Sequence, residues 1–232
     1  MRQAALMVTL VFLCVGLSVT AEAQDDPKQL EPKCDAGDLR ACVRLGGFYN
    51  QGLFGLKQEP ARAVSLFERA CSGGNPEGCE NLGWAYQIGS GVGPDMSRAL
   101  KFYQKACDGK YALGCDRLGD AYHEGRGVGQ DYTRASALFE RACDLGHANG
   151  CESVADLADP RRNQLPDAKR WATFLEKKCD LGGSRGGDTC LTLGLHYDLG
   201  FLVPKDPNHA NDLFKKACLY ENKEACKLIV RK

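Results

Sequence analysis

The cysteines are the residues of this chain most able to do chemistry, because all but one of the 13 recur in pairs. Five pairs have seven intervening residues and the sixth has ten. Zinc sites favour about two to four intervening residues, and thiol–disulfide catalysis favours Cys-x-x-Cys, which is absent. The spacing therefore favours disulfides within the pairs over a metal site. The pairs are Cys34–Cys42, Cys71–Cys79, Cys107–Cys115, Cys143–Cys151, Cys179–Cys190 and Cys218–Cys226.

Other residue types show no assembled catalytic pattern. The four histidines lie in separate segments, so we expect surface or packing roles rather than a metal centre. No serine is followed by lysine three positions later, and Ser-Asp-Asn and Lys-Thr-Gly, the further motifs of serine β-lactamases, are absent. The sequence therefore predicts no catalytic residue, no cofactor and no metal. The histidines are His123, His147, His196 and His209.

The N-terminal segment, residues 1–23, has the charge, the apolar run and the small residues before Ala23 that are typical of a signal peptide. Cleavage after Ala23 would remove Cys14 and leave an even number of cysteines. Lipidation of Cys14 is disfavoured because Leu13 precedes it, where a small residue is expected. We therefore predict export to the periplasm or beyond, a short linker over 24–33 and no membrane span.

The cysteine pairs recur about every 36 residues, which indicates a stacked repeat array. After the second cysteine of a pair, apolar residues follow at helical spacing, as in Cys79, Leu82 and Tyr86. A glycine-rich turn comes next, and an acidic residue then opens a second helix. Each unit is therefore predicted to be a helical hairpin. The acidic residues are Glu59, Asp95, Asp131, Asp167 and Asp206.

The predicted fold is an all-α, tetratricopeptide-like solenoid over 34–232, with about five hairpins and a C-terminal capping helix, stapled by disulfides. The fourth unit departs from the pattern, with Ala158 for tyrosine, Pro160 in the turn, and Trp171 and Lys178 for alanine. We expect its turn to have a different shape. The units are 34–70, 71–106, 107–142, 143–178, 179–217 and the half-unit 218–232.

The Leu-Gly-x-x-Tyr-x-x-Gly, Gly-Val-x-x-Asp and Ala-x-x-x-Phe elements resemble the Sel1-like repeat. The added cysteine pairs resemble the Helicobacter cysteine-rich protein family, whose members are secreted or periplasmic. The resemblance to Sel1 proteins implies an adaptor that binds other proteins. The cysteine-rich family implies an alternative, penicillin binding or weak β-lactamase activity, with a cell-wall-related small molecule as ligand. A further alternative is an assembly factor for a membrane or redox complex.

If the first helix of each unit lines the concave side, as in tetratricopeptide repeats, its exposed positions form a groove. Those positions are rich in acids, with Arg40 as their one Arg or Lys, although the chain is neutral, with 30 basic and 30 acidic residues. We expect a basic protein or peptide partner, with Trp84 as an apolar anchor. The alternative is that the acids are simply solvated. The candidate partner-binding residues are Glu77, Glu80, Trp84, Gln87, Asp116, Asp120, His123, Glu152, Asp156 and Asp198.

Neutrality also gives no argument for nucleic acid. We expect a monomer that serves as a binding scaffold rather than an enzyme.

Overall fold

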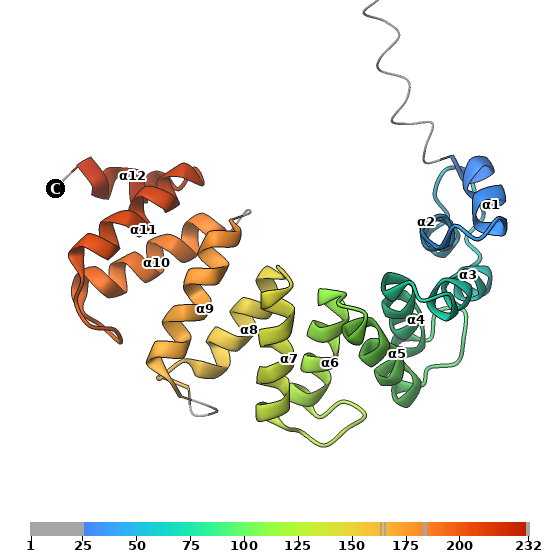
Figure 1. The fold of residues 1–232 in the computed structure, drawn as a ribbon, viewed down its shortest axis with the longest axis horizontal. Helices are drawn as coiled ribbons and strands as arrows, with labels where there is room; N and C mark the ends of the chain where they lie inside the picture. The colour runs from blue at the N-terminus through green and yellow to red at the C-terminus, as the bar shows by residue number, and fades with distance from the viewer. Residues whose placement is uncertain (1–25, 163, 165, 183–184, 231–232) are drawn as a thin grey trace, which may run out of the picture. The chain divides into compact units, whose positions relative to one another are not determined.

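A computed structural model describes residues 26–162, 164, 166–182 and 185–230. The predicted signal peptide, residues 1–23 with Cys14, lies outside this part of the chain. The described residues form helices joined by turns, without strands, as the repeat pattern predicts (Figure 1). The helices are α1 (Pro27–Asp35), α2 (Leu39–Gln51), α3 (Pro60–Ser72), α4 (Pro76–Ile88), α5 (Met96–Asp108), α6 (Ala112–Glu124), α7 (Tyr132–Asp144), α8 (Ala148–Ala158), α9 (Ala168–Leu181), α10 (Gly186–Leu199), α11 (Pro207–Leu219) and α12 (Lys223–Val230).

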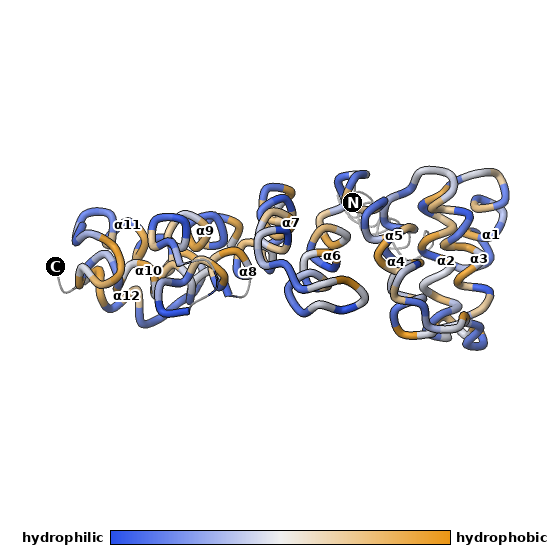
Figure 2. The backbone as a smooth tube through the Cα atoms, turned by 90° about the horizontal axis from the view of Figure 1, so that it is seen from below, coloured by the Kyte–Doolittle hydropathy of each residue, from blue (hydrophilic) through white to orange (hydrophobic). Residues whose placement is uncertain are grey.

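The chain divides into two compact units, with the boundary after Pro94. Helices α1–α4 belong to the first unit and α5–α12 to the second. Within the units, α2 packs on α3, α6 on α7, α8 on α9, and α10 on α11, which are four of the five predicted hairpins. The two helices of the predicted unit 71–106, α4 and α5, fall in different compact units. Figure 2 shows hydrophobic and hydrophilic residues alternating along the helices, as expected when each helix buries one face.

The predicted linker over 24–33 is wrong, because helix α1 begins at Pro27. Asp26 caps the helix by accepting a hydrogen bond from the backbone N–H of Lys28. Leu30 and Cys34 are buried, and α1 packs on α2. The helix thus takes the place of a second helix in a preceding half-unit. Its buried residues are only Pro27, Leu30 and Cys34, which is why the sequence pattern missed it.

The local signals for helix ends act as predicted in four of the five second helices. Asp95, Asp131, Asp167 and Asp206 each accept a backbone N–H at the start of the helix that follows. Glu59 makes no such bond to its helix. Four of the five first helices, α2, α4, α6 and α10, end in the left-handed region at glycine, as at Gly125 with a φ of 74°.

Three hairpins, α2–α3, α6–α7 and α10–α11, are held together by close contact between a glycine and an aromatic ring. A Cβ added at Gly119 would lie 2.6 Å from Cε1 of Phe139, and Gly194 meets Phe214 at the same distance. These glycines are therefore required by the approach of the paired helix rather than by backbone conformation.

We call the contact between the second helix of one hairpin and the first helix of the next hairpin a seam. At the α5–α6 and α7–α8 seams, glycine meets alanine rather than an aromatic ring. A Cβ added at Gly114 would lie 2.5 Å from the Cβ of Ala106, and one at Gly150 would lie 2.7 Å from that of Ala142. A disulfide joins the two helices beside each contact, with all six bonded as the spacing predicts. The disulfides are Cys34–Cys42, Cys71–Cys79, Cys107–Cys115, Cys143–Cys151, Cys179–Cys190 and Cys218–Cys226.

The fourth hairpin, α8–α9, exchanges large and small residues between its helices. Trp171 takes an alanine position and is buried with Ala155 and Ala158, which stand where other units have glycine and tyrosine. Helix α8 ends at Ala158, and Asp159 continues in extended rather than left-handed backbone. The turn therefore has the different shape that Pro160 predicts.

Candidate binding face

The candidate residues of the first unit lie on α4 and differ in exposure. Glu77 is exposed, and Trp84 and Gln87 are half-buried. Glu80 is only 5% exposed, which contradicts its assignment to an open groove. It directly follows a cysteine, as Asp116 does in the second unit.

Asp116 lies in the seam between two hairpins of the second unit and is also buried, contrary to prediction. Its Oδ2 lies 3.4 Å from Nε2 of His147, the residue that precedes helix α8. The N-terminus of the following first helix thus covers the position after the cysteine. A groove-facing position must be sought one turn further along each first helix.

Asp120 is that position on α6, and it is half-buried. Burial, followed by repulsion from Asp116, raises the pKa of Asp120 from 3.8 to about 6. Arg126 lowers this pKa by less than burial and Asp116 raise it, and smaller effects come from Glu124, which raises it, and from Arg117, which lowers it. Helix α6 therefore carries an acidic pair, in which Asp116 is buried and Asp120 is the member that a partner can reach.

The acids of α8 and its turn have basic partners instead. Glu152 lies 2.9 Å from the Nζ of Lys178 on α9, and Asp156 lies 3.3 Å from Arg162. Arg161 donates hydrogen bonds to Asp159 and lowers the pKa of that carboxyl. The prediction that the whole face is acidic is therefore wrong at α8 and the turn that follows it. The prediction considered only the charged residues of first helices, whereas these basic residues lie on α9 and in the α8–α9 turn.

His123 and a small cavity occupy the groove between α6 and α8. The cavity has a volume of about 80 Å³. Oε1 of Gln164 is buried and finds no hydrogen-bond partner among the described residues. This pocket is polar and too small for more than a side-chain tip. It is lined by His123, Phe139, Ser153, Asp156, Leu157, Arg162 and Gln164.

Helix α10 carries two acids, Asp188 and Asp198. Asp188 accepts a hydrogen bond from Nδ2 of Asn222 at 2.7 Å, and Asp198 is half-buried. Leu195 and Leu199 on the same helix are exposed. The face of the second unit therefore changes from acidic on α6 to apolar on α10.

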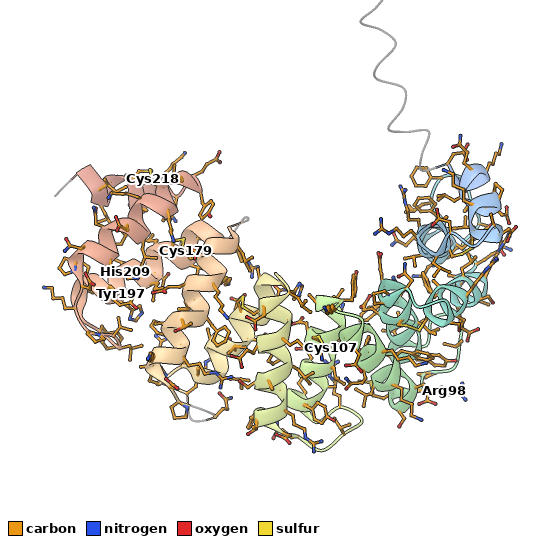
Figure 3. The ribbon with its side chains drawn as sticks, viewed as in Figure 1. Arg98, Cys107, Cys179, Tyr197, His209 and Cys218 are labelled. Atoms are coloured by element: carbon orange, nitrogen blue, oxygen red, sulfur yellow. A yellow bond between two sulfur atoms is a disulfide. The ribbon has the colours of Figure 1, made fainter. Side chains whose placement is uncertain are left out.

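His209 contacts side chains of the neighbouring helices. Nε2 of His209 lies 2.9 Å from Glu176, which also accepts a hydrogen bond from the hydroxyl of Tyr197 at 3.2 Å. Figure 3 shows Tyr197 and His209 next to each other, with ring centroids 4.5 Å apart. Burial, followed by the charge of Glu176, raises the pKa of Tyr197 to about 12. Among the described residues, no three or more His, Cys, Asp or Glu side chains gather as a metal site would require.

The geometry defines a class of protein, a repeat array of helical hairpins with a disulfide at each seam. The Sel1 repeat profile matches residues 39–75, 76–111, 112–147 and 189–219, which is more than half of the chain. The chain belongs to the Sel1 repeat family. The profile leaves out most of the fourth hairpin, where the exchanged residues lie.

Several known proteins are similar to parts of this chain in fold or in sequence. A Sel1 repeat protein of Oxalobacter formigenes is 23% identical with a TM-score of 0.64, over 82% of this chain and 76% of that one, which shows the fold alone. The Helicobacter pylori cysteine-rich protein B is 27% identical over 59% of this chain and 98% of its own, with a TM-score of 0.44. Cytochrome c oxidase assembly factor 7A of Xenopus laevis is 36% identical over 59 residues, 25% of this chain. The matched segment spans about a quarter of that relative's length.

Sel1 repeats generally mediate contacts between proteins, and this chain is built of Sel1 repeats. Six disulfides are typical of an oxidising, exported environment. Within the described part of the chain, each helix is too short or too polar to cross a membrane.

Proposed function

We propose that this protein is an exported scaffold whose second unit binds a basic segment of a partner protein at the acidic pair of α6. The observation that best supports this proposal is the raised pKa of Asp120, which lies beside Asp116. A carboxylate held ionised in such surroundings at neutral pH costs free energy, and a nearby cation lowers that cost. A lysine or arginine of a partner would supply the cation, and the acids of α8 already have theirs.

A labelled peptide tests this proposal. A fluorescein-labelled Gly-Arg-Gly-Arg-Gly peptide should bind the oxidised full chain more tightly than Gly-Glu-Gly-Glu-Gly, as measured by fluorescence anisotropy at low salt. Asp120→Asn should weaken binding about fivefold, the effect of one partly screened charge of about 1 kcal/mol. Asp156→Asn is the matched control, because Arg162 already pairs with that carboxylate. Equal binding of the two peptides would contradict the proposal.

Trp84 of the first unit stays a candidate apolar anchor, because its side chain is half-buried on α4. Trp84→Ala should weaken capture of a native partner without changing the binding of the short arginine peptide. Trp84 would be excluded as an anchor if capture were unchanged.

A second candidate function is assembly of an envelope redox complex, favoured by the segment shared with the cytochrome c oxidase assembly factor. Purification of the tagged full chain from envelope extract should then recover oxidase subunits. The β-lactam alternative is supported by resemblance alone, and hydrolysis of a chromogenic cephalosporin tests it. Cleavage after Ala23 remains our prediction for export, and N-terminal sequencing of the mature chain tests it.

A further inference from the structure

The seam between α9 and α10 differs from the other seams of the second unit. The α5–α6 and α7–α8 seams are closed by contact between alanine and glycine. At the third seam the corresponding residues are Lys178 and Thr189. The adjacent disulfide, Cys179–Cys190, spans a sequence separation of 11 instead of 8. Larger side chains and a longer connection therefore occur together.

The result is an open pocket rather than a closed seam. It has a volume of about 270 Å³, and Lys178, which is 6% exposed, forms part of its wall. An ammonium group carries three N–H donors, and among the described residues Glu152 accepts one of them at 2.9 Å. The pocket is lined by Glu152, Leu175, Lys178, Arg185, Asp188, Thr189 and Thr192.

Stability does not explain this lysine. Burying an ammonium group is costly even when it is paired, and a paired buried charge is often no better than an apolar residue. The repeat already offers alanine for this position, as at Ala106 and Ala142, which would close the seam. Lys178 therefore fits a binding role better than a packing role.

An apolar pocket adjoins the charged one, and Thr192 lines both. It has a volume of about 220 Å³ and is lined by Arg161, Thr192, Leu195, His196, Leu199 and Phe201. Leu199 is 72% exposed and Phe201 is 53% exposed, which is unusual for such large apolar side chains. The charged pocket is lined by two cations, Lys178 and Arg185, and by two carboxylates, Glu152 and Asp188. Glu152 pairs with Lys178 and Asp188 accepts a hydrogen bond from Asn222, and an exposed apolar surface lies beside these groups.

We propose that this double pocket binds the C-terminal end of a peptide chain with apolar last residues. The free carboxylate would accept hydrogen bonds from Lys178 and Arg185, and an apolar side chain would cover Leu195, Leu199 and Phe201. A single small acid would fill the charged pocket and leave the apolar surface uncovered, so the combined site favours a peptide. The inference does not use the acidic pair of α6, and either proposal can fail without the other.

Isothermal titration calorimetry of the oxidised full chain tests the site with two peptides. Acetyl-Gly-Ala-Leu-Phe with a free carboxylate should bind at least tenfold more tightly than the same peptide with a C-terminal amide. Equal binding of acid and amide, or no detectable binding of either, would overturn the proposal. N-acetyl-leucine binding as tightly as the peptide would overturn the peptide assignment in favour of a small-acid site.

Amino-acid substitutions test whether the peptide binds in this pocket. Lys178→Met should weaken binding of the free acid at least tenfold and leave the amide unchanged. Lys177→Met is the control, because that lysine pairs with Asp144 at 2.7 Å outside the pocket. The double variant Lys178→Ala/Thr189→Gly rebuilds the alanine–glycine pair of the other seams, so it should fold and lose binding. Unchanged affinity in this folded double variant would refute the assignment.

Discussion

Replacing Asp120 by asparagine should stabilise the protein at neutral pH. A pKa of about 6 in the folded chain, against an ordinary value of 3.8, means that ionisation costs about 3 kcal/mol more in the folded state than in the unfolded one. Asp120 is only half-buried, so solvent screening reduces the expected gain to about 1–2 kcal/mol. Because the folded pKa is raised, the native state binds the extra proton between pH 3.8 and about 6, and stability falls as the pH rises through that window.

Urea unfolding of the wild type and Asp120→Asn at pH 7.5 and pH 4.0, with disulfides intact, measures this effect. The variant should be more stable at pH 7.5 by the stated amount, and the difference should shrink to a few tenths of a kcal/mol at pH 4.0, where the native carboxyl is protonated. Asp156→Asn on the neighbouring first helix is the control, because it removes a surface ion pair and should stabilise at neither pH. A gain that does not depend on pH, or no gain at pH 7.5, would refute the assignment of a strained carboxylate on α6.

Packing and cross-linking give two further predictions. Gly119→Ala places a methyl group 2.6 Å from the ring of Phe139 and should cost about 1–3 kcal/mol of unfolding free energy. Gly129→Ala, in the following turn, meets no atom within 4 Å, and a similar loss there would contradict the packing argument. Removing the disulfide with Cys107→Ala and Cys115→Ala should cost roughly 2–3 kcal/mol, given its short loop, with faster hydrogen exchange in α5 and α6. Unchanged stability and exchange would show that the seam holds without its cross-link.

The sequence predicted the hairpins well because their signals are local and repeated. Cysteine spacing, the aspartate before four of the five second helices and the glycine after four of the five first helices all act within a few residues of their position. The glycine after leucine, as in Gly119, also indicated close helix packing. Helix α1 was missed because its few apolar residues, Leu30 among them, pack mainly on a neighbouring helix.

The candidate site could be predicted only in part, because charge balance on a face depends on side chains from other elements. Lys178 was recognised as an exception to the repeat, yet its partner Glu152 lies on a different helix, 2.9 Å away in space. Asp116 looked exposed in the helical register, and the start of the next hairpin covers it. Such contacts follow from the angle between hairpins, which no local pattern encodes.

The order of the disulfides along the chain has a consequence for biogenesis. From Cys34 to Cys226, each cysteine is bonded to its immediate neighbour in sequence, first with second and third with fourth. A chain that enters an oxidising compartment with its N-terminus first therefore exposes each native partner as the next available thiol. Oxidation in order of appearance yields the native connectivity without rearrangement, and each seam can be sealed while later repeats are still entering.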